Sequence, residues 1–222
     1  MIYQVRLFRG LRDPRAMLHQ LGQAETVYGL NNRVMLLFLS SLLIFAVSGW
    51  FGLGTHEISA EINNLSNSQF EWEKFLFWIG RLVSGLLFAA IYLYIMSLWF
   101  DIWTEAPFKH LLIVQAFAFL PILIEKIIHI LCVSLLGLDW YSSPVSLGAI
   151  AQSAHAPAWI IYFSGCATLF KVWSMYIQFI GLRKLAAMQR GAALLVTVSI
   201  HLIFWAITAT LAFFELGSFL NI

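Results

Sequence analysis

Five long apolar stretches, almost free of charged side chains, constrain the fold of this chain more than any other feature. They cover approximately Val34–Gly52, Phe75–Phe100, Leu111–Leu136, Pro157–Leu182 and Ala192–Phe214. A helix needs about 20 apolar residues to cross roughly 30 Å of hydrocarbon, and in lipid its backbone polar groups must be satisfied internally. We therefore expect an all-α polytopic bundle of five transmembrane helices, formed by residues 34–222 after a basic segment of residues 1–33.

The overall composition agrees with a membrane protein. Of 222 residues, 61% are hydrophobic and 11% are charged, whereas soluble domains carry about a quarter charged residues. This composition excludes a soluble globule, a disordered chain and a disulfide scaffold. The sequence contains no Gly-x-Ser-x-Gly nucleophile motif and no phosphate-binding glycine loop, and nothing in it indicates nucleic-acid binding or a cofactor. We therefore expect no enzymatic activity.

Lysine and arginine are distributed unequally between the predicted loops. Nine lie on one side of the predicted spans and Lys74 alone lies on the other. The nine are Arg6, Arg9, Arg12, Arg15, Arg33, Lys109, Arg183, Lys184 and Arg190. Because cytoplasmic loops carry the excess of basic residues, we expect the N-terminus in the cytoplasm and the C-terminal tail, residues 215–222, outside.

The segment before the first span has the features of a short amphipathic helix. Asp13 followed by Pro14 predicts a helix start, Gly22 predicts its end, and Met17, Leu18 and Leu21 give it an apolar side. With the arginines upstream, this pattern is typical of an interfacial segment on an anionic inner leaflet. The alternative interpretation is that these arginines only set the topology, and the two are compatible.

Six ionisable residues lie inside the predicted spans, where charge is costly. They are Arg81, Glu125, Lys126, His129, Lys171 and His201. Glu125 and His129 share one face of the third span, since they are four residues apart. Glu125 is the single acid near mid-depth, and we expect Lys171 to pair with it. Lys126 then needs a second acceptor, water or a route to the interface.

These residues permit three interpretations. The first is an interhelical polar cluster that fixes packing. The second is a proton or ion relay through Glu125, His129, Lys171 and His201. The third is a zinc site of Glu125, His129 and His201, but the His-Glu-x-x-His order is absent and we predict no metal.

Two further residue patterns affect helix packing. Pro121, one turn before Glu125, predicts a kink in the third span. Small residues at Gly80, Ser84, Gly85 and Ala89 make the second span the best candidate for a tight helix contact, whether internal or with a partner.

Several stretches resemble Yip-domain membrane proteins. Ala116–Ile124 is similar to the aromatic, small, proline and aliphatic pattern of that family's third span. Lys171–Tyr176, followed by Gly181 and Leu182, resembles its fourth-span ending. The basic loop 183–191, the apolar fifth span and the entry at residues 8–21 follow the same order.

The resemblance implies a function as well as a topology. The short basic N-terminus is unlike the longer acidic one of eukaryotic members, so Rab-GTPase binding is not carried over, and the chain looks more like the bacterial branch. Some bacterial members are accessory subunits of ABC-type exporters that resist antimicrobial peptides. We therefore expect a non-enzymatic accessory protein of a bacterial cytoplasmic membrane, which packs against transporter subunits or itself. The alternative is a small proton- or ion-coupled transporter.

Overall fold

A computed structural model describes residues 2–55 and 66–214. Its long helices are α3 (Leu30–Trp50), α5 (Asn67–Ala90), α7 (Phe108–Leu136), α10 (Leu169–Leu185) and α11 (Arg190–Phe213). Its shorter helices are α1 (Leu7–Arg12), α2 (Pro14–Gly22), α6 (Met96–Ile102), α8 (Gly148–Ser153) and α9 (Ala158–Cys166). Strands β1 (Ile2–Gln4) and β2 (Thr26–Tyr28) pair in parallel.

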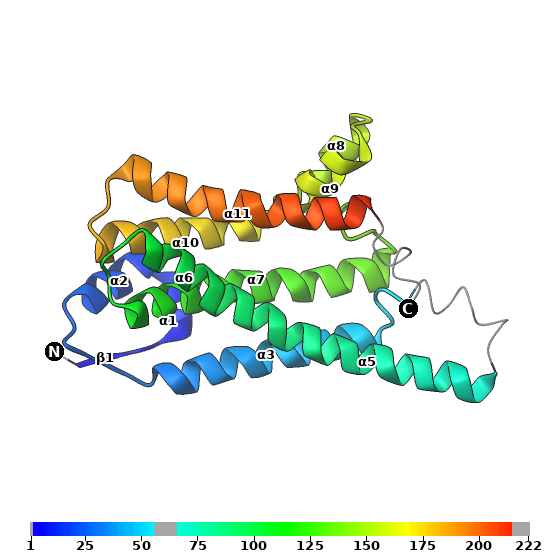
Figure 1. The fold of residues 1–222 in the computed structure, drawn as a ribbon, viewed down its shortest axis with the longest axis horizontal. Coiled ribbons are helices and arrows are strands. Elements are labelled where there is room, and N and C mark those ends of the chain that lie inside the picture. Colours follow the sequence, from blue (N-terminus) through cyan, green and yellow to red (C-terminus); the bar gives the residue numbers. More distant parts are fainter. Residues whose placement is uncertain (1, 56–65, 215–222) are drawn as a thin grey trace.

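The described residues form an all-α membrane bundle. Four helical segments are long and apolar enough to cross a membrane, namely Leu30–Trp50, Asn67–Ile102, Phe108–Leu136 and Arg190–Phe213. The second of these joins α5, the π-helical turn Ile91–Ile95 and α6 into one continuous segment. Figure 1 shows these segments side by side, with α7 between the α3–α5 pair and α11.

The fourth apolar stretch differs from its prediction. Residues 157–182 do not form one helix, because α9 ends at Cys166 and α10 begins at Leu169. In Figure 1 the chain leaves α7 at one end and returns through α9 and α10 to the end that holds the N-terminus. Helix α9 packs against α11, while α8 projects from the bundle. A fifth, continuous spanning helix is therefore not present among the described residues.

The third stretch is the centre of the bundle. Most of the first half of α7 is buried, including Phe117 and Phe119, and α10 packs closely along it. A Cβ added at Gly181 of α10 would meet Val114 at 2.6 Å, so the two backbones approach closely there. Pro121 lies within α7, which continues through it as one helix.

The tight contact predicted for the second span is internal. A Cβ at Gly85 would lie 2.9 Å from Phe45 of α3, and Ser41 of α3 donates a 2.7 Å hydrogen bond to the Gly85 carbonyl. Ala89, one turn further along α5, is fully buried. Gly80 and Ser84 lie on the other side of the helix, where Ser84 is exposed and nothing lies within 4 Å of a Cβ at Gly80.

The N-terminal helix has the predicted start and end, but its apolar side does not face outward. Asp13 accepts a 3.1 Å hydrogen bond from the amide of Ala16 and caps α2. Met17, Leu18 and Leu21 are buried, because α2 packs on α10 and α7 instead of offering this side to lipid. Burying such side chains against protein contributes about 1.5–3 kcal/mol each.

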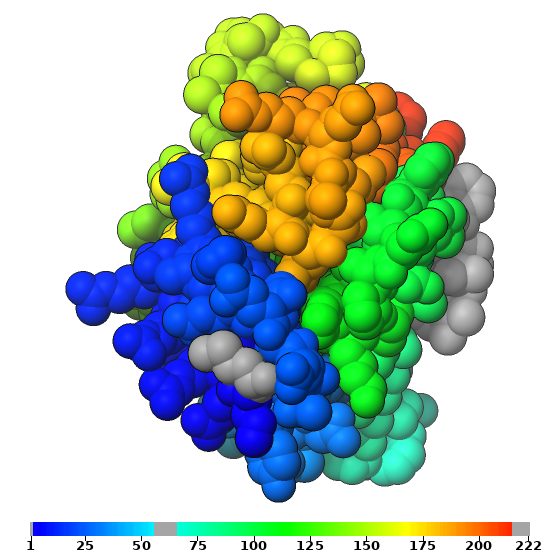
Figure 2. Space-filling model, turned by 90° about the vertical axis from the view of Figure 1, so that its left-hand side faces the viewer, coloured from blue at the N-terminus to red at the C-terminus, as the bar shows by residue number. Residues whose placement is uncertain are grey.

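The basic side of the same segment faces outward. Arg6, Arg9, Arg12 and Arg15 are all exposed. Figure 2 shows this N-terminal segment beside the connection between α10 and α11, at one end of the molecule. The tail of residues 215–222, predicted to be outside, is not among the described residues.

Candidate functional site

The break between α9 and α10 is closed by a loop of the same chain. The Leu147 amide donates a 3.0 Å hydrogen bond to the Ala167 carbonyl, and the Leu169 amide donates a 3.1 Å bond to the Val145 carbonyl. Unpaired backbone groups are costly at membrane depth, and irregular backbone is tolerated only where it is buried in protein or lines a cavity. The loop therefore makes the interruption of the helix possible.

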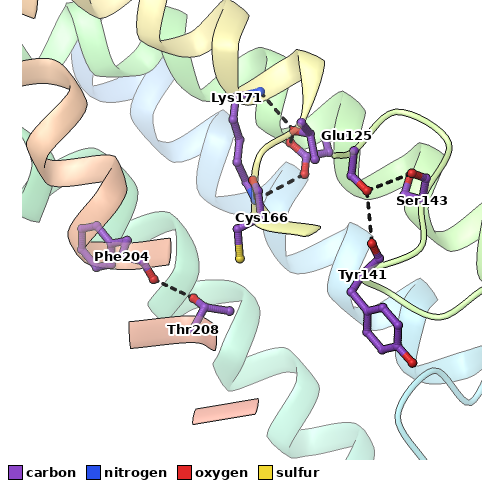
Figure 3. A network of polar contacts seen from close by, with 9 residues as sticks. Glu125, Tyr141, Ser143, Cys166, Lys171, Phe204 and Thr208 are labelled. Carbon is purple, nitrogen blue, oxygen red and sulfur yellow. Dashed lines mark hydrogen bonds and ion pairs between the residues drawn. The ribbon is translucent and has the colours of Figure 1, made fainter. Parts of the chain in front are cut away.

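Glycine allows this loop to come close. A Cβ at Gly165 would lie 2.8 Å from the Cα of Tyr141, and a Cβ at Gly148 would lie 1.9 Å from the Tyr141 carbonyl oxygen. The hydroxyl of Ser146 donates to the carbonyls of Tyr141 and Ser143, which holds the loop in its turn. Figure 3 shows Tyr141 and Ser143 of this loop beside Glu125. Residues 141–148 thus pack closely against the break and supply the backbone partners that a continuous helix would otherwise provide.

Three side chains meet at the break. Thr168 donates a 2.8 Å hydrogen bond to Glu125 Oε2 and accepts one from the Lys171 amide, so it caps α10. The Lys171 ammonium lies 3.7 Å from Glu125 Oε1 and donates a 2.7 Å bond to the Cys166 carbonyl. Figure 3 shows Glu125 and Lys171 directed toward each other. The pair predicted from sequence is confirmed.

The carboxylate of Glu125 is well placed at this position. The N-terminus of a helix carries a partial positive charge, and a carboxylate there is stabilised by the helix dipole and by the capping hydroxyl. The side chains of Glu125 and Lys171 are 13% and 24% exposed, so solvent screens the attraction between their charges only in part.

Lys126 is held differently. Its ammonium lies over the ring of Phe88, 5.2 Å from the centroid, and 6.0 Å from that of Phe45. Such cation–π contacts stabilise an ammonium without neutralising it. Within residues 2–55 and 66–214 no carboxylate pairs with Lys126, so the acceptor that the sequence required is an aromatic surface.

These groups line a cavity of about 320 Å³ on the bundle side of the break. Its polar wall contains Glu125, Lys126, His129, Lys171 and His201. Aromatic side chains form much of the remaining wall, namely Phe88, Tyr92, Trp140, Phe204 and Trp205. The lining comes from both α5 and α11, which make no extensive contact with each other, so the cavity lies between two separated helices.

The π-helical turn shapes one side of this cavity. Ile91 and Tyr92 belong to the turn and line the cavity, and the Tyr92 hydroxyl is hydrogen-bonded to Ser174 of α10. Tyr92 also stacks on Phe119 of α7, with ring centroids 5.0 Å apart. Single π-helical turns inside α-helices are frequent at functional sites.

His201 belongs to a second polar network that the sequence did not indicate. Its Nε2 lies 2.8 Å from Gln178 Oε1, and Gln178 Nε2 donates a 2.8 Å bond to Gln115 Oε1. All three side chains are buried. Two glutamines in apolar helices carry no formal charge, so a search for ionisable residues passes over them, although a polar side chain inside a span is itself a signal.

Arg81 lies apart from the cavity. Its guanidinium donates a 2.8 Å bond to Ser48 of α3 and lies over the rings of Phe45 and Phe77. It borders a second hollow of about 600 Å³, which shares Lys126 and His129 with the first. The six predicted residues therefore surround two adjacent hollows, and only Glu125 and Lys171 are paired with each other.

The zinc interpretation has no support in the geometry. Among the described residues, no three His, Cys, Asp or Glu side chains are grouped closely enough to hold a metal ion. Cys132 and Cys166 are both buried free thiols.

Fold and site define an all-α protein of the membrane, with four helices able to span it and a polar cavity at an interrupted helix. Comparisons of the chain with family models, curated proteins and solved structures find no match.

Proposed function

We propose that this protein is a non-enzymatic membrane protein that binds an anionic amphiphile in the cavity at the helix break. The main support for the proposal is the setting of Lys126. This cation lines the cavity, and among the described residues only aromatic rings hold it. Glu125 is already satisfied by Thr168 and Lys171. The site thus has one more lysine than carboxylate, and an incoming carboxylate or phosphate would balance it.

The rest of the cavity suits an apolar tail. Ligand pockets of about 300–1,000 Å³ are typically lined by apolar and aromatic side chains with a few placed polar groups, and this cavity has that character. It lies between α5 and α11, where a molecule dissolved in the bilayer could enter sideways. An anionic head near Lys126 and a tail along Phe204 and Trp205 would match both parts of the lining.

The same proposal includes a topology. The chain crosses the membrane five times, with α9 and α10 together making the fourth crossing as an interrupted helix. Support comes from the path in Figure 1, in which the basic N-terminal segment and the α10–α11 connection lie at the same end. By the positive-inside rule this end faces the cytoplasm of a bacterial cell.

A second candidate is the accessory role that the resemblance to Yip-domain proteins implies. It is favoured by α8, which projects from the bundle, and by the exposed apolar side chains Leu147, Ile150 and Ile160 in and beside it. Such a projection offers a lateral surface to another membrane protein. Purification in mild detergent, followed by mass spectrometry, should then recover transporter subunits in a fixed ratio, and a lone chain or homo-oligomer would contradict this role.

Tryptophan fluorescence tests the binding proposal directly. Trp140 and Trp205 line the cavity, so a brominated long-chain carboxylate that enters it should quench their emission. A brominated amine of the same chain length serves as the matched probe of opposite charge. We expect saturable quenching by the carboxylate, at least tenfold weaker binding of the amine, and a smaller quenching amplitude in Trp205→Phe, because Trp140 still lines the cavity.

Two variants separate the site from general partitioning into the detergent or bilayer. Lys126→Gln should weaken carboxylate binding, while Lys74→Gln, which removes an exposed lysine at the start of α5, should leave it unchanged. Equal quenching by both probes, or equal binding in the wild type and Lys126→Gln, would contradict the proposal.

A further inference from the structure

Another pocket lies at the N-terminal end of the bundle, far along α10 from the helix break. Its volume is about 400 Å³, and it is formed where α2 docks on the last turns of α10. The residues that line it are Arg15, Tyr176, Phe179, Ile180, Arg183 and Lys184. Three of the six are cationic, and none of these described lining residues is acidic.

The three cations come together because of the fold. Arg15 lies on α2, more than 150 positions before Arg183 and Lys184, which belong to the last turn of α10. The buried apolar side of α2 holds it against α10, and the Arg15 guanidinium carbon lies 6.0 Å from the centre of the Tyr176 ring. The sequence indicated a basic surface, but it did not indicate that these residues share one pocket.

An apolar track leads away from this pocket. Leu169, Val172 and Tyr176 are 67%, 56% and 42% exposed, and their spacing places them on one face of α10. The track runs from the helix break to the pocket, along the surface that faces lipid in a bundle of this kind. A cationic pocket at the end of an apolar track matches the two parts of a phospholipid.

We propose that this pocket is a specific binding site for the headgroup of an anionic phospholipid, in the leaflet at the N-terminal end of the bundle. Arg15, Arg183 and Lys184 contact the phosphate, and one acyl chain lies along Leu169, Val172 and Tyr176. Basic pockets on the cytoplasmic side of helical membrane proteins bind anionic headgroups in this way. The site is separate from the cavity at the break, and it holds whether or not that cavity binds a ligand.

Native mass spectrometry of the purified full-length chain tests the site. The delipidated protein is titrated with phosphatidylglycerol and with phosphatidylcholine of the same acyl chains. We expect one phosphatidylglycerol to be retained at least about fivefold more tightly than phosphatidylcholine, since each basic residue near an anionic surface contributes about that factor. Arg15→Gln and Arg183→Gln should each lower this retention about fivefold.

Matched controls decide between a site and a general surface charge. Arg12→Gln removes an exposed arginine one residue before the Asp13 cap and outside the pocket, and it should leave retention unchanged. Circular dichroism of each variant checks that the helices remain folded. We expect them to do so, because the substituted side chains are exposed. Equal loss in Arg12→Gln, or equal retention of the two lipids, would overturn the proposal.

A last arm distinguishes a lipid from a soluble anion. Glycerol phosphate carries the headgroup chemistry without acyl chains. We expect it not to displace phosphatidylglycerol at concentrations where free lipid does, because it cannot use the apolar track. Full displacement by glycerol phosphate would mean that the pocket binds a soluble phosphate and would overturn the assignment to a lipid.

Discussion

The hydroxyl of Thr168 donates a 2.8 Å hydrogen bond to Glu125 at the point where the fourth apolar stretch stops being helical. The same hydroxyl accepts from the Lys171 amide, so one side chain both caps α10 and fixes the carboxylate. The helix break and the buried acid are therefore one structural feature. A threonine by itself does not interrupt a helix in an apolar stretch.

The ion pair at the break predicts a stability effect. Glu125→Gln keeps the acceptor for Thr168 but leaves Lys171 without its counter-charge, and we expect a loss of about 1–3 kcal/mol. The measurement is thermal or denaturant unfolding of the purified protein in detergent. The double variant Glu125→Gln with Lys171→Met should recover part of the loss, because the uncompensated charge is gone. Additive losses would contradict a direct pairing.

Gly165 provides a steric test of the loop at the break. Gly165→Ala would place a methyl group 2.8 Å from the Cα of Tyr141, and we expect it to destabilise the protein by about 1–3 kcal/mol. Gly80→Ala is the matched control, since nothing lies within 4 Å of that position and an alanine favours the helix by about 0.5–1 kcal/mol. If both variants unfold at the same temperature, residues 141–148 do not pack against α9 as described.

The buried glutamine network should be cooperative. Gln178→Met removes the partner of both His201 and Gln115, and we expect a loss of about 1–3 kcal/mol because two buried polar groups are left unpaired. Ser84→Ala, which removes an exposed hydroxyl bonded to its own helix, should change stability little. Unfolding curves of Gln115→Met with Gln178→Met would show less than the summed single losses if the two amides interact directly.

Tyr3 predicts sensitivity to alkali. Burial raises the pKa of Tyr3 to about 12, and its hydroxyl has no hydrogen-bond partner among the described residues. The neutral phenol is therefore favoured in the folded protein, so its contribution is fully present below pH 10 and is lost as the pH rises from about 10 to 12. Tyr3→Phe should abolish this part of the decline between pH 9 and pH 12. An unchanged slope in the variant would assign the decline to other groups.

Sequence patterns predicted most of the fold because long apolar runs, helix caps and charge distribution are local properties. The Asp13 cap and the Glu125–Lys171 pair follow from such properties, and both are confirmed. The break at residues 167–168 was missed, because neither Ala167 nor Thr168 is a helix breaker. The break depends on backbone hydrogen bonds to Val145 and Leu147. These residues are distant from the break in sequence and reach it only because the loop folds back.

The site could be predicted only in part for a similar reason. Charge identifies Lys126, but its contact with Phe88 depends on how α5 and α7 pack. The apolar side of α2 indicates only that something covers it. In the structure this side packs on α10 and α7, so protein covers it and lipid does not. The same packing brings Arg15 into one pocket with Arg183.

A structure determined with the brominated carboxylate bound would show where the ligand lies. We expect an interrupted helix at residues 167–168, the carboxylate near Lys126, and the bromine signal among the aromatic side chains of the cavity. A continuous helix through residues 157–182, or bromine found only on the outer surface of the bundle, would contradict the proposal.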